Sequence, residues 1–165
     1  MSILRAKTKL IALVLLLLAS SACAQTKCVF DENYFSEIKY KENRNISNYV
    51  WSKHDKEVKG ITNDGTMFSI KHWSCDHYGS HAIMFLGPYF SFDTENINEY
   101  FMRLGNLALE REEISIIENY LSKKPISLSS EGETIQLNTG EYSEFYLAYS
   151  ISNDILIFEI KVYRD

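Results

Sequence analysis

Hydrophobic and polar residues alternate along much of this chain with a period of two, which predicts β-strands that have one buried and one exposed face. In the run before Cys75, the alternation places Met67 and Trp73 on one face and Phe68 and His72 on the other. The same pattern predicts strands over residues 56–62, 66–75, 81–86, 133–138, 142–151 and 155–163.

Turn sequences separate these strands at short intervals. Asn63-Asp64-Gly65 and Ser152-Asn153-Asp154 each lie between two strand-forming runs, and Asp and Gly at such positions favour tight antiparallel hairpins. Residues 43–48 are mostly polar and are predicted to form a loop. Most strand connections are therefore expected to be local.

Between the two groups of strands, the hydrophobic period changes to that of a helix. Apolar residues recur from Ile97 to Ala108 at spacings that form one stripe, and the phase is lost at Arg111-Glu112-Glu113. A second helix is predicted to begin there and to end before Pro125, and a short helix is predicted over 31–41. Together these elements predict one α+β domain, an antiparallel sheet of hairpins with two central helices packed on one face.

The first 24 residues differ from the rest and match a secretory signal peptide. Three basic residues precede the apolar run Leu10–Ala19, and the segment closes with Ala22-Cys23-Ala24. The apolar run is about half of the roughly 20 residues that span a bilayer, so cleavage is expected rather than retention as an anchor. Residues 25–165 are therefore predicted to act in the periplasm or outside the cell. A lipid anchor at Cys23 is the alternative, but Ser20 stands where a lipidation signal carries a Leu-like residue.

The charge of the chain argues against nucleic acid as a partner. The sequence has 17 Lys and Arg against 22 Asp and Glu, a net charge of −5. Loss of the three basic residues in the first 24 lowers this to −8. A domain of this charge is repelled by phosphate backbones, so a protein in the cell envelope is the expected partner.

The cysteines predict a disulfide. Without Cys23, the chain keeps only Cys28 and Cys75. Two thiols in an exported domain favour a disulfide bond, here between Cys28 and Cys75.

One segment, residues 72–81, concentrates the residue types that carry chemistry. It holds three of the four histidines, and three interpretations compete. The first is a polar turn over residues 76–80 that bends at Tyr78-Gly79 and follows a structural half-cystine. The second is a metal site built by His72, His77 and His81 with Asp76. The third is a thiolate nucleophile at Cys75 with His72 or His77 as its base. An oxidising compartment argues against the third interpretation.

The sequence carries no nucleotide, redox or metalloprotease motif, and no cofactor is expected. Aromatic residues are abundant, and exposed aromatic side chains are common at recognition surfaces. The predicted function is a small exported, non-catalytic binding protein, of the inhibitor or immunity type, directed against an enzyme of the envelope. The alternative is a small metal- or thiol-dependent enzyme centred on residues 72–81. The candidate binding surface is formed by His72, Asp76, His77, Tyr78, His81, Tyr89 and Phe90.

Overall fold

The computed structural model describes residues 30, 35–74, 78–87, 97–126, 132–138 and 143–164. It confirms the α+β class: seven strands form one sheet in the order β1-β2-β3-β4-β7-β6-β5, and every neighbouring pair is antiparallel. The strands are β1 (Ile46–Ser52), β2 (Glu57–Thr62), β3 (Met67–Ser74), β4 (Tyr78–Leu86), β5 (Glu133–Asn138), β6 (Ser143–Ser152) and β7 (Ile155–Arg164). The helices are α2 (Ile38–Lys41), α3 (Ile97–Ala108) and α4 (Arg111–Lys123).

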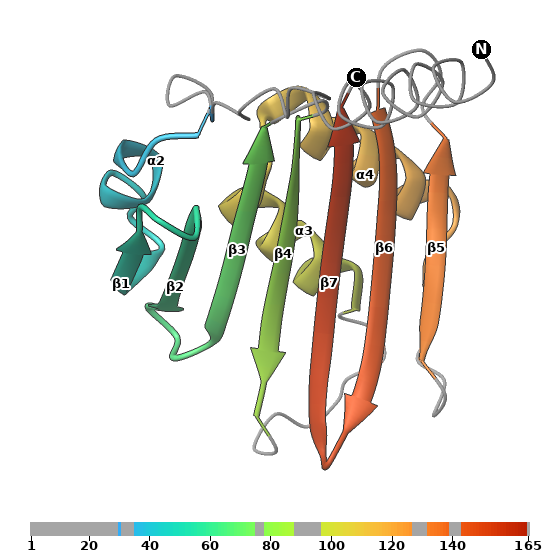
Figure 1. The fold of residues 1–165 in the computed structure, drawn as a ribbon. Coiled ribbons are helices and arrows are strands. Elements are labelled where there is room, and N and C mark those ends of the chain that lie inside the picture. Colours follow the sequence, from blue (N-terminus) through green and yellow to red (C-terminus); the bar gives the residue numbers. More distant parts are fainter. Residues whose placement is uncertain are drawn as a thin grey trace, which may run out of the picture.

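The sheet consists of two meanders that join at its centre (Figure 1). Strands β1–β4 follow one another in space as in sequence, and β5, β6 and β7 do the same from the opposite edge inward. The seam between them is the β4–β7 pair, whose register runs from Tyr78 opposite Arg164 to Leu86 opposite Leu156. Both predicted hairpin turns are present. Gly65 adopts a positive φ of 85° in the first, and Asn153 and Asp154 adopt positive φ angles in the second, as tight hairpin turns require.

Alternate residues of each strand divide the sheet into two faces with different surroundings. One row of register partners runs through Trp51, Val58, Ile70, Ala82 and Ile160, and all of these except half-buried Trp51 are fully buried. We call this side the inner face. The next row runs through Val50, Lys59, Ser69, Ile83 and Glu159, which are exposed or half-buried, and we call this side the outer face.

The inner face packs against helix α3, which Figure 1 shows behind the central strands together with α4. The Phe101 ring of α3 meets the Phe158 ring of β7 edge-on, with 4.9 Å between centroids. Ile117 and Leu121 of α4 are buried in the same core. A capping box between Glu110 and Glu113 fixes the start of α4, where the loss of helical phase predicted a new helix. Among the described residues, no helix has the length and apolarity needed to cross a bilayer.

Three predicted elements differ from the structure. Residues 43–48 are not entirely a loop, because β1 begins at Ile46. Residues 78–80 continue strand β4 instead of bending, and the Trp73 ring packs over Gly79 where any side chain would overlap it. In the predicted 31–41 helix, the described helical residues are only Ile38–Lys41, and residues 31–34 lie outside the described part of the chain.

Candidate functional site

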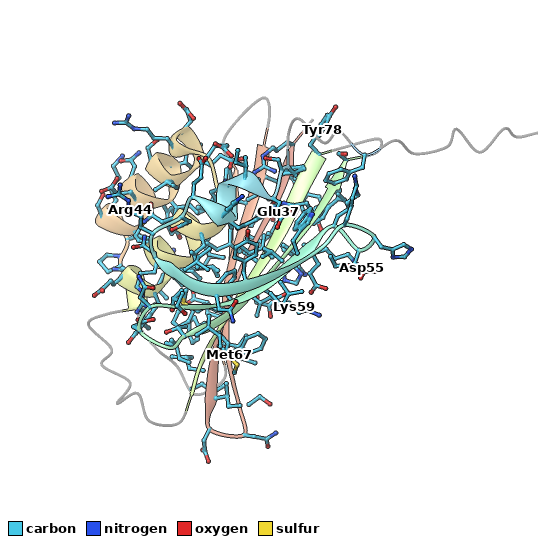
Figure 2. All side chains as sticks on the ribbon, turned by 90° about the vertical axis from the view of Figure 1, so that its left-hand side faces the viewer. Glu37, Arg44, Asp55, Lys59, Met67 and Tyr78 are labelled. Carbon is cyan, nitrogen blue, oxygen red and sulfur yellow. The ribbon has the colours of Figure 1, made fainter. Side chains whose placement is uncertain are left out.

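The outer face contains an apolar hollow of about 640 Å³ between β1, β2, β3 and β4. Val50, Ile61 and Met67, all in its wall, are 71, 42 and 56 % exposed. Ile83 and Phe85 of β4 complete the apolar lining. Large apolar side chains gathered on one exposed surface are unusual on an isolated domain and mark interaction sites. The labelled side chains of Lys59 and Met67 lie below the curve of the edge strand in Figure 2.

The hollow has one polar end, which is held by hydrogen bonds. The Ser69 hydroxyl donates to Glu57 Oε1 at 2.7 Å, and Lys59 Nζ lies 3.1 Å from Glu57 Oε2. Partial burial raises the pKa of Glu57, but the hydrogen bonds from Ser69 and Lys59 outweigh this effect and the pKa is lowered. The carboxylate therefore stays charged and fixed in place, so the hollow combines an apolar wall with a rigid polar end.

A strip of aromatic side chains crosses the outer face at the opposite end of the central strands. The rings of Trp73 and Tyr163 lie 5.4 Å apart, and those of Tyr163 and Tyr146 lie 5.9 Å apart edge-on. The Tyr146 hydroxyl donates to Glu144 at 2.9 Å, and this hydrogen bond raises the pKa of Tyr146. We call Trp73, Tyr163 and Tyr146 the aromatic strip.

His81 lies between the hollow and the aromatic strip. Its Nε2 is 2.9 Å from Glu159 Oε2 on β7, and both side chains are partly exposed. The outer face therefore presents a hydrogen-bonded imidazole–carboxylate pair, an apolar hollow and a set of aromatic rings on one sheet. These are the components of a recognition surface, in which apolar contacts supply affinity and charged pairs set orientation.

His72 lies on the inner face and is only 4 % exposed. The Tyr40 hydroxyl contacts His72 Nε2, and His72 Nδ1 lies 2.9 Å from Ser80 Oγ. Burial raises the pKa of Tyr40 above its ordinary value, so Tyr40 stays protonated and its hydroxyl donates a hydrogen bond to Nε2. The His72 proton is therefore on Nδ1, where it donates to Ser80. The ring of Phe35 covers the imidazole in a stacked arrangement at 4.3 Å.

The hydrogen-bonded chain continues from Ser80 to helix α4. Arg164 Nη1 donates to Ser80 Oγ at 3.4 Å, and its Nε and Nη2 donate to the two oxygens of Glu113 at 2.5 and 2.8 Å. Burial, with the nearby positive charges of Lys39 and Arg164, lowers the pKa of His72 from 6.5 to about 3. The imidazole is thus neutral, and this inner chain connects α2, the sheet and α4.

The described residues of the predicted binding surface do not form one surface. His72 and His81 belong to opposite faces of the sheet, because they are an odd number of positions apart in the β3–β4 register. Their rings therefore do not converge on one ion. Tyr78 is half-buried at the start of β4. Asp76, His77, Tyr89, Phe90, Cys28 and Cys75 lie outside the described residues. Among the described residues, no group of three or more His, Cys, Asp or Glu side chains is placed to hold a metal ion.

The sequence pattern contained part of the signal for the outer face. The alternation correctly separated Met67 and Trp73 from Phe68 and His72. The alternation did not identify strand β1. The hollow was therefore missed, because Val50 of β1 forms part of its wall. No family model matches the chain, and neither a curated protein nor a solved structure matches it.

Proposed function

We propose that the protein is an exported, non-catalytic binding protein of the inhibitor or immunity type, which binds a protein of the cell envelope through its outer face. The observation that carries this proposal is the apolar hollow with Val50, Ile61 and Met67 exposed in its wall. Burial of such side chains against a partner releases about 25 cal/mol per Å² of apolar surface. A hollow of this size accepts one or two large side chains of a partner as anchors.

The arrangement of layers supports the outer face as the binding side. In this proposal α3 and α4 together cover the inner face, so the described part of the outer face is left for a partner. The inner chain of His72 and Ser80 is internal support in this view, because both side chains are almost completely buried.

The proposed disulfide between Cys28 and Cys75 also gains support. The Phe30 ring lies 5.8 Å from the Phe35 ring, which stacks on His72. Phe30 is two positions from Cys28 in sequence, and His72 is three positions from Cys75. The chain segments that flank the two cysteines therefore meet at one end of β3. A disulfide there fits the proposed periplasmic or secreted location.

A matched pair of variants tests the proposed surface. Met67→Glu places a charge in the hollow, whereas Ile38→Glu makes the same kind of change on α2 at a side chain that is 57 % exposed. Each form is immobilised and exposed to an envelope extract, and every retained protein is then purified and its affinity measured by calorimetry. We expect a specific partner whose affinity falls at least about tenfold with Met67→Glu and is unchanged with Ile38→Glu.

Several outcomes would contradict the proposal. A partner that binds both variants as tightly as the original chain would exclude the hollow as its site. Stoichiometric bound metal, or two free thiols of which one is unusually reactive, would instead favour the alternative of an enzyme centred on residues 72–81.

A further inference from the structure

Strand β1 is an edge strand, and its regular part, residues 48–52, lacks the usual protection against pairing. Within the described part of the chain it is the last strand of the sheet on its side, and it pairs with β2 through only one of its two edges. Edge strands in soluble proteins are normally guarded by charged residues, proline or bulges. Strand β1 reads ISNYVWS and contains no charged residue and no proline.

The one irregularity of β1 lies at its beginning. The register shifts between Ile46 and Asn48, whereas residues 48–52 pair regularly with residues 61–57 of β2. This regular part includes Val50, which is 71 % exposed on the outer face. An extended backbone with a large exposed β-branched side chain is a template for a further strand.

We propose that β1 pairs with β1 of a second copy of this chain, so that two sheets join into one continuous antiparallel sheet across a two-fold axis at Val50. The choice of a second copy follows from the sequence of the strand. Around Val50, this axis places Asn48 opposite Ser52 of the other copy, and Tyr49 opposite Trp51 of the other copy. Every pair combines side chains of one kind, and aromatic and β-branched cross-strand pairs stabilise antiparallel sheets.

Charge does not oppose this pairing at the strand itself. The chain has a net negative charge, but a two-fold contact through β1 brings no charged strand residue opposite its own copy. An isologous interface of this kind is the commonest route to a dimer. The contact also changes the hollow, because Val50 of the second copy would lie beside Val50 at its open side. Each copy then contributes one residue to the hollow of the other.

The opposite edge of the sheet provides a control. Strand β5 begins with Glu133 and exposes Gln136, so this edge carries the charge that β1 lacks. The substitution Gln136→Lys therefore adds a charge at an edge strand that takes no part in the proposed contact.

The test measures the molar mass of the purified chain, expressed from its full coding sequence, by light scattering from about 5 to about 500 µM. We expect the mass to approach twice that of one chain in this range, both for the original protein and for Gln136→Lys. Val50→Lys and Val50→Glu should each remain monomeric, because like charges would face one another at the axis. An equimolar mixture of these two variants should recover the doubled mass as a mixed dimer.

Circular dichroism of each variant confirms that the fold is kept, which the exposure of Val50 leads us to expect. The proposal is overturned if the original chain keeps the mass of one copy throughout the range. It is also overturned if Val50→Lys still forms the dimer, or if the mixture of the two charged variants stays monomeric. The measurement requires no envelope partner, so its outcome is independent of the function proposed above.

Discussion

Mild acid is expected to destabilise the fold chiefly through one buried side chain, His72. In the unfolded chain the imidazole takes up a proton near pH 6.5, whereas in the folded chain its pKa is lowered to about 3. Between these two values the unfolded state binds more protons than the folded state. The contribution of His72 to the free energy of unfolding is therefore fully present above pH 6.5 and is lost as the pH falls toward 3.

The size of the effect follows from the pKa difference. A solution at about pH 4.5 lies about two pH units below the pKa of the imidazole in the unfolded chain, whereas the folded chain still keeps the imidazole neutral. Protonation therefore favours the unfolded state by about 3 kcal/mol at this pH. This is a large fraction of the roughly 5–15 kcal/mol that stabilises a typical domain. The main structural reason is that the protonated imidazole would carry its charge in a buried site away from water. Protonation at Nε2 also removes the acceptor for the Tyr40 hydroxyl and adds a positive charge near Lys39 and Arg164.

Urea unfolding at about pH 7.5 and about pH 4.5 measures this loss, with His72→Gln as the variant that cannot titrate. The glutamine amide of this variant keeps a polar group at the end of the side chain. We expect His72→Gln to be less stable at neutral pH by about 1–3 kcal/mol, since buried hydrogen bonds are disturbed. Between the two pH values, however, it should lose about 3 kcal/mol less than the original chain.

The exposed histidine of the β1–β2 connection serves as the control. His54 has a side chain that is 97 % exposed, and His54→Gln should keep the loss of stability that the burial of His72 causes on acidification. If the original chain and His72→Gln lost equal stability on acidification, the assignment of the acid sensitivity to His72 would be wrong.

Two further predictions concern the connections between elements. Replacing both Cys28 and Cys75 by serine should lower the free energy of unfolding by up to about 4 kcal/mol, because the proposed bond would close a loop of about 50 residues; reductant should bring the original chain to the same urea midpoint and leave the variant unchanged. Replacing Glu113 by Gln should cost about 3–5 kcal/mol in urea unfolding, since Arg164 is mostly buried and would keep its charge without a carboxylate partner. In that second case, equal stability of Glu113→Gln and the original chain would show that the ion pair is not needed.

The sequence predicted the elements whose signals are local. The hairpin at Asn63-Asp64-Gly65 and the new helix at Arg111 were found because turn residues and helical phase are encoded by neighbouring positions. Strand β1 was missed because only Ile46, Tyr49 and Trp51 pack against the core, and its other residues are polar or exposed. Its place as a strand depends on β2, which is a contact between segments rather than a local preference.

The candidate site was harder to predict than the fold. The cluster of histidines in residues 72–81 suggested one surface, but the period of a strand sends His72 and His81 to opposite faces. The turn predicted over residues 76–80 failed in its described part, residues 78–80, for a related reason. Gly79 has no side chain, and this leaves room for the Trp73 ring within the strand instead of causing a bend.

The position of β7 at the centre of the sheet has a consequence for how the chain folds. This strand is synthesised after all the other described strands, yet it forms the seam with β4 and carries the Arg164 that reaches Glu113. A ribosome-bound chain without residues 155–164 has two incomplete meanders and no shared core between them. Native structure is therefore expected to form only after synthesis has passed β7, at a rate limited by closure of this long loop. For the export proposed above, late closure of this kind would leave the chain unfolded long enough to pass through a translocation channel.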